Sequence, residues 1–414
     1  QFIAGPDFEA PADNGGNNIY DVQVTATDNG ANPGTLSTVQ NIAVTVTGVN
    51  DANPVFTSAS AVSIEENTQA VVTLAATDAD VPGQTVSFAI TGGADAGLFQ
   101  IVGGNQLQFI AGPDFEAPGD NGGNNVYDVQ VTATDDGANP GTLSTVQNLA
   151  VTVTGVNDAN PVFTSASAVS IEENTQAVVN LTATDADDPA QTVSFAITGG
   201  ADSALFEIIG GNQLRFLGTD IPDFEAPGDN GGNNIYDVQV TATDNGMNPG
   251  TLSTVQNLAV TVTGVNDASP VFTSAAAVSI EENTQAVVTL AATDADDPVQ
   301  TVSFAITGGA DAGLFQIVGG NQLQFVAGPD FEAPGDNGGN NVYDVQVTAT
   351  DNGANPGTLS TVQNLAVTVT GVNDNAPVFT SSAAITQDEN IQSVVTLAAT
   401  DADDPAQTVS FAIT

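Results

Sequence analysis

Acidic residues two positions apart recur along this chain and carry its clearest chemical signal. One pair is Asp78 and Asp80, and another is Asp114 and Glu116. Residues two apart in an extended backbone point the same way, so each pair presents two carboxylates on one side. Such carboxylates, placed beside further acids, repel one another unless a cation lies between them. The spacing therefore predicts a cation site built from oxygen ligands.

The composition restricts the kind of cation that such a site would hold. The chain has 414 residues and contains no His and no Cys, so imidazole and thiolate ligands are both missing from the sequence. Oxygen ligands select a hard cation, and a cluster that offers roughly six to eight oxygens favours Ca²⁺ over Mg²⁺. The same composition excludes a serine triad, a cysteine nucleophile and an imidazole-bound or thiolate-bound zinc. We therefore do not expect an enzyme.

The acids gather at the ends of the expected strands. Residues 52–158 contain twelve acids, and eight of them fall in five short motifs. These motifs are Glu65-Glu66-Asn67, Asp78-Ala79-Asp80, Asp114-Phe115-Glu116, Ala133-Thr134-Asp135 and Asn157-Asp158. An alternative interpretation is that Asp and Asn simply favour turns and that their charge is solvated. Turn propensity does not explain why the same acidic motifs recur in every unit that contains them.

The net charge excludes two classes of partner. One basic residue, Arg215, stands against 49 acids, and the formal charge is -48. Such a chain has almost no positive charge with which to attract phosphate backbones or anionic membrane surfaces. No stretch approaches the roughly 18 consecutive apolar residues of a membrane span, so we expect no membrane insertion in this segment. Arg215 replaces the Gln108 and Gln324 of neighbouring units, and we interpret it as an exposed strand residue.

The chain repeats itself at intervals close to one small domain. The string VNDANPVF at residues 49–56 returns with small changes at 156–163, 265–272 and 372–379. Its aspartates, Asp51, Asp158, Asp267 and Asp374, are 107, 109 and 107 residues apart. That period is typical of a domain rather than of a solenoid unit. We predict complete units at 52–158, 159–267 and 268–374, with partial units at 1–51 and 375–414.

Alternating hydrophobic residues predict that each unit is all-β. In residues 126–134, Tyr127, Val129, Val131 and Ala133 share one face of an expected strand. Further strands are expected at 55–64, 70–76, 84–91, 98–102 and 106–110, with a final strand through 149–153. A change of parity between Val146 and Leu149 predicts a bulge or a bend there. Seven short strands in about 107 residues indicate a tandem array of antiparallel Greek-key β-sandwiches.

The five motifs, in this order, resemble those of the cadherin extracellular repeat, in a bacterial-type tandem array. Glu-Asn resembles the PEN motif, Asp-Phe-Glu the DRE motif and Asp-Ala-Asp the DxD motif. Ala-Thr-Asp-Asn-Gly resembles AxDxG, and residues 372–379 resemble the DxNDNxPxF linker. The resemblance covers the whole chain. It implies an extracellular or cell-surface location and a calcium cluster between successive repeats.

By that resemblance, each boundary between units is a joint that takes ligands from both sides. The first joint would use Asp7, Glu9, Asn50, Asp51, Asp78, Asp80 and Asp135. The second would use Glu66, Asp114, Glu116, Asn157, Asp158, Asp185, Asp187 and Asp244. The third would use Glu173, Asp223, Glu225, Asn266, Asp267, Asp294, Asp296 and Asp351. The fourth would use Glu282, Asp330, Glu332, Asn373, Asp374, Asp401 and Asp403.

One departure from the family pattern affects the expected number of ions. The family linker begins with Asp, but here that position is Gly48, Gly155, Gly264 or Gly371. One carboxylate is lost at each joint, so we expect two or three Ca²⁺ per joint. At 387–390 the Glu beside Asn persists while its neighbour changes, which favours Glu66 over Glu65 as the ligand.

The leading functional hypothesis is a calcium-stiffened extracellular rod or fibre segment of a large repetitive surface or matrix protein, serving cell adhesion or a biofilm matrix. The lack of Cys suggests a bacterial or archaeal source. The alternatives are binding modules for other copies of itself, for cell-surface components or for carbohydrate, and an accessory array of a secreted enzyme. Residue 1 corresponds to Gln108 and residue 414 to Thr91. We expect a window on a longer array, with a filament subunit that exchanges strands as the alternative.

Overall fold

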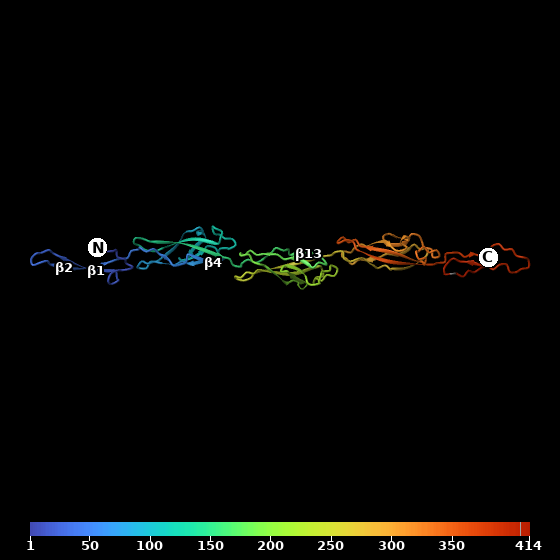
Figure 1. Ribbon diagram of the computed structural model, residues 1–414, viewed down its shortest axis with the longest axis horizontal. Helices are drawn as coiled ribbons and strands as arrows, with labels where there is room; N and C mark the ends of the chain where they lie inside the picture. The colour runs from blue at the N-terminus through green and yellow to red at the C-terminus, as the bar shows by residue number, and fades with distance from the viewer. Residues whose placement is uncertain (406) are drawn as a thin grey trace. The chain divides into compact units, whose positions relative to one another are not determined.

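The computed structural model describes residues 1–405 and 407–414 and is built almost entirely from β-strands (Figure 1). Its contacts divide the chain into two compact units, which are described separately. The first unit comprises Gln1–Thr164, Thr182–Phe195 and Thr241–Val255, and the second comprises Ser165–Leu181, Ala196–Val240 and Gln256–Thr414. The division runs through the middle copy of the repeat and leaves every joint inside one unit.

Residues 52–158 form a two-layer sandwich in the first unit. The strands are β3 (Val55–Phe56), β4 (Ala61–Glu65), β5 (Ala70–Thr73), β6 (Ala76–Thr77), β7 (Ser87–Gly92), β8 (Phe99–Val102), β9 (Gln106–Phe109), β10 (Val126–Thr134) and β11 (Ser144–Thr154), with a short 3₁₀ turn at Ala96–Leu98. One sheet has the order β4-β11-β10-β7 and the other has the order β5-β9-β8, while β3 pairs with β6. The predicted all-β sandwich is confirmed. The observed β3 and β4 together match the strand predicted at 55–64, and β5 and β6 together match the one predicted at 70–76.

The second unit contains an equivalent sandwich at 268–374. Its strands are β21 (Val271–Phe272), β22 (Ala277–Glu281), β23 (Ala286–Thr289), β24 (Ala292–Thr293), β25 (Ser303–Gly308), β26 (Phe315–Val318), β27 (Gln322–Phe325), β28 (Val342–Thr350) and β29 (Ser360–Thr370), with a 3₁₀ turn at Ala312–Leu314. The sheet orders are β22-β29-β28-β25 and β23-β27-β26. Near-identical sequences therefore give the same topology twice.

The middle copy contributes strands to both units. Its strands are β12 (Val162–Phe163), β13 (Ala168–Glu172), β14 (Ala177–Asn180), β15 (Ala183–Thr184), β16 (Ser194–Gly199), β17 (Phe206–Ile209), β18 (Gln213–Phe216), β19 (Ile235–Thr243) and β20 (Ser253–Thr263), with a 3₁₀ turn at Ser203–Leu205. In the first unit β12 pairs with β15. In the second unit β14, β18 and β17 form one sheet.

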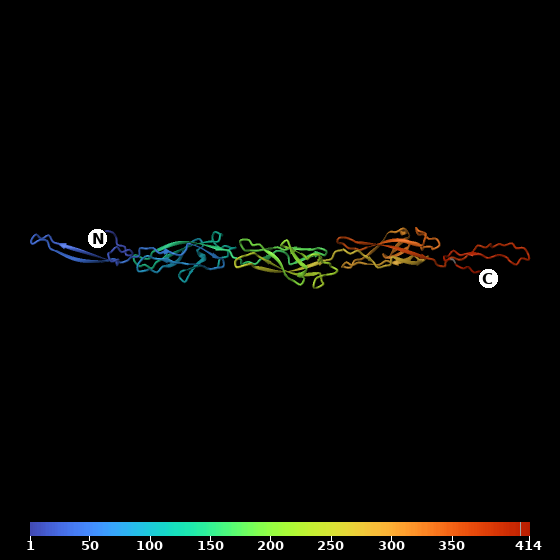
Figure 2. The ribbon, with the colours of Figure 1, turned by 60° about the horizontal axis from the view of Figure 1, so that its bottom comes forward.

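The two end segments carry fewer strands. In residues 1–51, β1 (Ile19–Thr27) and β2 (Ser37–Thr45) form a two-stranded antiparallel ribbon, and both views show it without a second sheet laid over it (Figures 1 and 2). In residues 375–414, β30 (Val378–Phe379) pairs with β31 (Ala399–Thr400). Many apolar side chains of these segments are exposed, Val22, Val24 and Val394 among them.

The prediction of a wholly antiparallel sandwich was wrong at one place in each complete copy. Strand β4 runs parallel to β11, with Val62 opposite Val151 and Ile64 opposite Val153. The reason is that the first strand breaks after Phe56. Its first part pairs with β6, and its second part crosses to the other sheet and joins the edge of β11. Such strand switching joins the two layers of a sandwich.

Of the bulge or bend predicted near residues 146–149, the bulge was also wrong. The pairing of β10 with β11 is continuous from Val126–Thr152 to Thr134–Ser144. Val146 is 53% exposed, and Gln147 turns inward, where its Nε2 donates a hydrogen bond to the carbonyl oxygen of Ser58. A polar residue on the inner face explains the change of parity without a bulge. An irregularity does occur where β10 pairs with β7, between Gln130 and Val131.

The core fixes the direction in which each acidic motif points. Tyr127, Val129, Val131 and Ala133 of β10 are all buried, as the alternation predicted. The ring of Tyr127 packs edge-on against Phe109 at a centroid distance of 5.0 Å. Burying side chains of this size contributes about 1.5–3 kcal/mol each. Because this face of β10 packs into the core, the orientation of β10 is fixed, and Asp135, which follows it, lies at one end of the sandwich.

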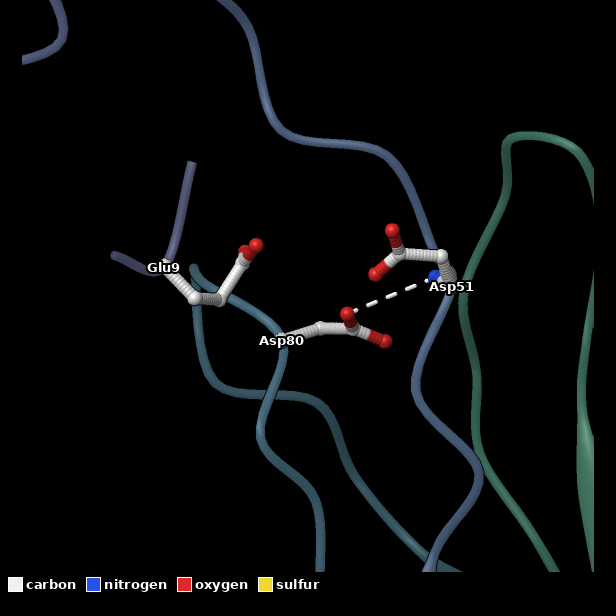
Figure 3. A group of neighbouring side chains, drawn as sticks. All are labelled: Glu9, Asp51 and Asp80. Carbon is white, nitrogen blue, oxygen red and sulfur yellow. Dashed lines mark hydrogen bonds between the residues drawn. The ribbon is translucent and has the colours of Figure 1, made fainter. Parts of the chain in front are cut away.

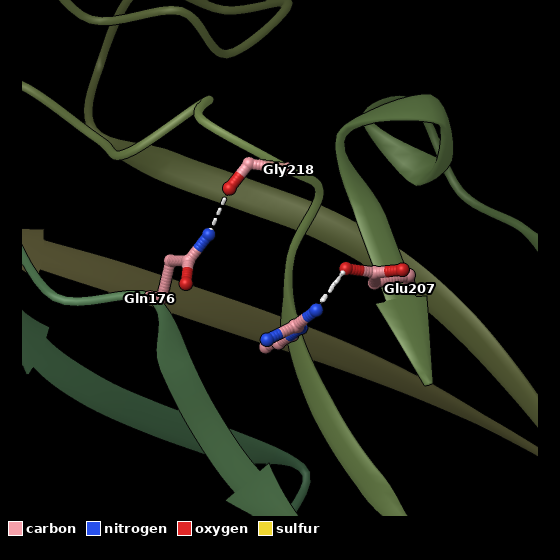
Figure 4. A network of polar contacts seen from close by, with 4 residues as sticks. Gln176, Glu207 and Gly218 are labelled. Carbon is pink, nitrogen blue, oxygen red and sulfur yellow. Dashed lines mark hydrogen bonds and ion pairs between the residues drawn. The ribbon is translucent and has the colours of Figure 1, made fainter. Parts of the chain in front are cut away.

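Arg215 lies in strand β18 of the second unit, as predicted, but its side chain is partly buried rather than exposed. Its guanidinium is half-buried and forms an ion pair with Glu207 on β17, with Nη2 and Oε1 2.8 Å apart. Figure 4 shows Glu207 and, beside it, the hydrogen bond from the amide of Gln176 to the carbonyl of Gly218. Equivalent strands of the copy 52–158 place Gln100 opposite Gln108. One neutral pair has thus been replaced by one charged pair.

Candidate metal centres at the repeat joints

Acidic side chains from distant parts of the sequence converge at the joints. Among the described residues, four groups of three acids each bring carboxylate oxygens within 4.8 Å of one another. These groups are Glu9, Asp51 and Asp80; Glu66, Glu116 and Asp158; Glu173, Asp223 and Glu225; and Glu282, Glu332 and Asp374. Every member is a residue that the sequence predicted as a ligand. We call these groups the acidic triplets.

Figure 3 shows how three chain segments build the first triplet. Glu9 comes from the segment before β1, Asp51 from the linker after β2, and Asp80 from the loop after β6. The backbone nitrogen of Asp51 donates a hydrogen bond to Asp80 Oδ1 at 3.4 Å. This first triplet thus joins residues from both sides of the boundary between residues 1–51 and 52–158, as the resemblance implied.

Glu66 is held in place by two backbone amides. It is only 3% exposed. Its Oε1 accepts a hydrogen bond from Val156 N and its Oε2 accepts one from Phe115 N, both at 2.8 Å. Glu173 and Glu282 repeat this arrangement. The carboxylate thereby ties the linker to the Asp-Phe-Glu loop, and this tie positions both segments for the triplet.

Glu65 has a different environment from Glu66. It is exposed, and its Oε1 accepts a hydrogen bond from the side-chain amide of Asn248 at 2.9 Å. The structure thus brings Glu66, and not Glu65, into the triplet of the second joint. This arrangement agrees with the choice made from residues 387–390.

The Asp-x-Asp motif supplies an orphaned carboxylate oxygen. Asp80 is buried and accepts hydrogen bonds from the backbone of Asp51 and Ala52. Asp78 Oδ1 accepts a bond from Asp80 N, whereas its Oδ2 is buried with no hydrogen-bond partner in the described part of the chain. The Oδ2 atoms of Asp185 and Asp294 are likewise buried with no hydrogen-bond partner among the described residues. Buried polar atoms without partners are rare, and a cation beside them fits this donor set.

The Asp-Phe-Glu motif contributes unequally to the triplets. Glu116 joins the second triplet, and its Oε1 also accepts a hydrogen bond from Asp188 N across the joint at 3.0 Å. Asp114 lies outside that triplet and binds the amide of Ala117. At the third joint both Asp223 and Glu225 belong to the triplet.

The electrostatics of Glu116 show excess negative charge. Burial raises the pKa of its carboxyl, and the negative charges of Glu66 and Asp158 raise it further, against the lowering effect of the Asp188 amide. The pKa of Glu225 is raised for the same reasons, with Glu173 and Asp267 as the charged neighbours. A cation bound among these groups would reverse the effect, because it favours the ionised form.

Two predicted ligands of each complete joint lie together but bind protein groups. Asp135 Oδ1 accepts hydrogen bonds from Gly137 N and from Leu143 N, both at 3.0 Å. The side-chain amide of Asn50 donates to the same oxygen at 3.1 Å. Asp244 with Asn157, and Asp351 with Asn266, repeat these contacts.

The other predicted ligands have simpler environments. Asp7 Oδ1 binds the amides of Glu9 and Ala10, and Asp330 Oδ1 binds the amide of Ala333. Asp187 and Asp296 are buried like Asp80, and Asp403 accepts a bond from Asp374 N. Asp401 Oδ1 accepts a bond from Asp403 N. Asn373 of the fourth joint is exposed, unlike Asn50, Asn157 and Asn266.

Two neutral residue types at the joints were not predicted from the sequence. The Nδ2 of Asn67 donates to Asp158 Oδ2 at 2.7 Å, and Asn174 and Asn283 do the same for Asp267 and Asp374. The Nε2 of Gln84 donates to Asn50 Oδ1 and Asp80 Oδ2. Both types have a constant position in the sequence. The Asn directly follows the Glu of the Glu-Asn motif, and the Gln always follows the Asp-x-Asp motif after three residues. Neither type attracts notice in a search for charged ligands.

Comparison with known proteins gives the same interpretation of the fold. No family model matches the chain. Cadherin-23 of Rattus norvegicus is 32% identical over 385 residues, which cover 87% of this chain and 11% of that protein. The crystal structure of the Protocadherin GammaB4 extracellular domain matches with a TM-score of 0.59 at 24% identity, covering 94% of this chain and 62% of that one. The chain is a tandem array of cadherin-like repeats.

Further relatives agree with this assignment. Protocadherin Fat 4 of Mus musculus is 30% identical over 378 residues, which cover 87% of this chain and 7% of that protein. The structure of mouse Cadherin-23 EC22-24 matches with a TM-score of 0.53 at 19% identity, covering 77% of this chain and 99% of that one. The array thus spans about a tenth of the length of the curated relatives, at 11% of Cadherin-23.

The assignment also bears on what the array does. The expectation that the chain is not an enzyme rests on its lack of His and Cys, and the relatives named above carry cadherin or protocadherin names. None of the helices in the described residues has the length and apolar character needed to cross a membrane. Acidic clusters at the joints are therefore the most distinctive chemical feature of the described chain.

Proposed function

We propose that this array is a calcium-stiffened segment of an extracellular structural or adhesive protein. The observation that carries the proposal is the convergence of carboxylates at the boundary between successive repeats, with a buried and unpartnered oxygen of Asp78, Asp185 or Asp294 beside them. Cadherin relatives support the same role outside the cell. Repetition matters in this proposal because each proposed ligand set takes residues from two successive repeats, although three of the four triplets lie within one repeat.

The proposed repeat boundaries follow from these shared sites. The complete repeats are 52–158, 159–267 and 268–374, and the partial repeats are 1–51 and 375–414. Three linkers hold an aspartate that joins a triplet, namely Asp51, Asp158 and Asp374, whereas Asp267 lies outside the triplet of the third joint. The proposed ligands of each joint are the residues predicted from the sequence.

Charge explains why a cation would stiffen the joint. The second joint holds seven candidate carboxylates, Glu66, Asp114, Glu116, Asp158, Asp185, Asp187 and Asp244. Two like charges about 4 Å apart repel by about 4 kcal/mol at an effective dielectric constant of about 20. Three Ca²⁺ would almost balance seven negative charges, and two would leave a modest excess. We propose two or three ions per joint, because Gly155 removes one carboxylate of the family pattern.

The proposed setting is a large repetitive surface or matrix protein in which the array serves as a spacer. The partners would be Ca²⁺ and either further copies of the array or components of a cell surface or biofilm matrix. Sedimentation of the array with and without Ca²⁺ separates these partners, because a pure spacer stays monomeric whereas a self-adhesive module associates.

Small-angle X-ray scattering of the chain with Ca²⁺ and with excess chelator tests the stiffening. The expected result is a longer maximum dimension with Ca²⁺ and a shorter, broader distance distribution with chelator. A matched control replaces Glu66, Glu173 and Glu282 by Gln, and it is expected to lose most of this response. An unchanged maximum dimension of the wild-type chain after chelation would contradict the proposal.

A further inference from the structure

Four loops of this chain share the sequence Asp-Asn-Gly-Gly. They lie at 13–16, 120–123, 229–232 and 336–339. An asparagine followed by glycine deamidates readily, because glycine has no side chain to hinder attack by its own backbone nitrogen. Each loop therefore contains a possible site of spontaneous chemical modification.

Deamidation forms one bond and breaks another. The glycine backbone nitrogen loses its proton and attacks the side-chain carbonyl carbon of the asparagine, and the asparagine side-chain nitrogen takes up a proton and leaves as ammonia. Water then opens the cyclic imide to aspartate or isoaspartate, so the reaction needs no oxidant and no reductant. Its first step requires a glycine N–H that is free to lose its proton and to turn toward the asparagine side chain.

In each of the four loops the aspartate occupies this N–H. Gly122 N donates a hydrogen bond to Asp120 Oδ2 at 2.9 Å. The same bond joins Gly15 N to Asp13 Oδ2, Gly231 N to Asp229 Oδ2 and Gly338 N to Asp336 Oδ2, at 2.9–3.0 Å. The nitrogen that would attack the asparagine is therefore bonded to an anion.

Neighbouring contacts hold the same peptide groups in place. Asn121 N donates a hydrogen bond to Asp95 Oδ1 at 2.7 Å, and Gly123 N donates to the carbonyl oxygen of Asp120 at 3.2 Å. Asp120 is only 7% exposed, whereas Asn121 and Gly122 are exposed. Water therefore reaches the reactive pair, but Gly122 N can turn toward Asn121 only by breaking a charge-assisted hydrogen bond.

The lack of a side chain at the first glycine lets the carboxylate come this close. A Cβ atom at Gly122 would lie 3.1 Å from Asp120 Oδ2, and one at Gly231 would lie 3.2 Å from Asp229 Oδ2. Neither glycine has a left-handed φ. A side chain there would push the carboxylate away. The glycine that makes the pair prone to deamidation thus also admits the group that occupies its N–H.

We propose that the asparagines of the four loops are latent deamidation sites, which the carboxylate of the preceding aspartate keeps unreactive. Its negative charge disfavours loss of the glycine proton, and its hydrogen bond must break before the nitrogen can attack. Three other Asn-Gly pairs follow an aspartate in the same way, but Asp244 and Asp351 among those aspartates are proposed ligands of the joints. The four loops contain no proposed ligand, so this inference goes beyond the proposed calcium role and does not depend on it.

The rate of deamidation in the full chain tests the proposal. The chain is incubated at neutral pH with Ca²⁺, both folded and unfolded in urea, and its peptic peptides are followed by mass spectrometry. Asn121, Asn230 and Asn337 are expected to deamidate at least about tenfold more slowly in the folded chain, because reaction there requires local opening of the loop. These rates do not report whether Ca²⁺ binds, so failure here differs from failure of the proposed function.

Asp120→Ala removes one carboxylate and leaves the loops at 229–232 and 336–339 as controls in the same chain. Asn121 should then deamidate about tenfold faster than the asparagines of those loops, as expected from the loss of one hydrogen bond to a charged group. The matched control is Asn124→Ala, which removes the bond from Val126 N to Asn124 Oδ1 but leaves the carboxylate of Asp120 on Gly122 N. It should keep the wild-type rate at Asn121.

Three results would overturn the proposal. The first is that Asn121 of the wild-type chain deamidates as fast folded as in urea. The second is that Asp120→Ala leaves Asn121 as slow as Asn230. The third is that Asn124→Ala accelerates Asn121 as much as Asp120→Ala does, because stiffness of the loop would then be the cause. If Asp120→Ala does not fold, as fast deamidation of Asn230 and Asn337 would show, Asp120→Asn replaces it, since it keeps the shape of the side chain and loses the charge.

Discussion

Glu66 and Asp158 come from opposite ends of one repeat, and their carboxylate oxygens lie within 4.8 Å of each other. Glu66 reaches this position because the amides of Phe115 and Val156 hold its two oxygens. Asp158 is held by the side-chain amide of Asn67. The fold thus builds a close pair of like charges from three fixed segments, and a cation nearby would stabilise the ionised form of such a pair.

Glu66→Gln should remove the calcium response of the second joint. Gln lacks the charge, and its NH₂ group would face one of the two backbone amides that donate to Glu66. A buried donor left without an acceptor costs about 1–3 kcal/mol. We expect a lower denaturant midpoint and a smaller gain from added Ca²⁺. Glu65→Gln is the matched control, since it keeps an oxygen for Asn248 and should keep the full gain. Equal gains in both variants would contradict the assignment of Glu66.

Calcium should stabilise the array in a concentration-dependent manner. A ligand that binds only the folded state at about 100 times its dissociation constant adds about 2.7 kcal/mol per site. Calorimetric unfolding at rising Ca²⁺ should therefore show a rising transition temperature, and chelator should reverse it. Mg²⁺ at the same concentration should do less, because its octahedral geometry suits these crowded carboxylates poorly. Identical transitions in Ca²⁺ and chelator would contradict the expectation.

Asp120 should make the repeats sensitive to acid. Burial alone would raise its pKa, but loop amides led by Asn124 and Asn125 outweigh burial and hold the pKa below the ordinary value of 3.8. A carboxyl whose folded pKa is depressed stabilises the fold above that ordinary value, and its contribution is lost as the pH falls through the folded pKa.

The matched test replaces Asp120, Asp229 and Asp336 by Asn. In chelator at pH 7 the variant should unfold at a lower denaturant concentration than the wild-type chain. The difference should shrink as the pH falls below about 3.8, where the wild-type carboxyls take up protons. A constant difference from pH 7 to pH 2 would show that charge has no part in the effect.

Trypsin should cut this chain at one place, and only after local unfolding. Arg215 is the one basic residue in the sequence. It lies in the middle strand of the sheet β14-β18-β17 and is paired with Glu207. Backbone held in a sheet does not fit a protease cleft, so mass spectrometry should find the intact chain under native conditions. In denaturant, two fragments, 1–215 and 216–414, should form. Rapid native cleavage would contradict the strand placement.

The sequence predicts those features that depend on side-chain alternation and local spacing. The inward face of β10, from Tyr127 to Ala133, and the same-facing acids of Asp78 and Asp80 follow from the period of a strand. The parallel pairing of β4 with β11 does not, because it depends on where the first strand breaks and which sheet edge is free. Likewise, the inward Gln147 depends on a partner, Ser58, from a distant part of the sequence.

The same limit applies to the joints. Carboxylates attract attention in a sequence because clustered charge requires an explanation, and Glu66, Glu116 and Asp158 were found in that way. The neutral amides of Asn67 and Gln84 carry no such signal. Their roles depend on which acids and linker atoms the fold places within hydrogen-bond distance.

The calcium stoichiometry of the chain tests the central claim most directly. Isothermal titration calorimetry of the chelator-treated chain, together with anomalous scattering from crystals grown in Ca²⁺, counts the ions and places them. Two or three ions are expected at each complete joint, with density beside Glu66, Glu116 and Asp158 and their equivalents. If no Ca²⁺ binds even at high Ca²⁺ concentration, this expectation is contradicted. The acids would then be interpreted as solvated turn residues.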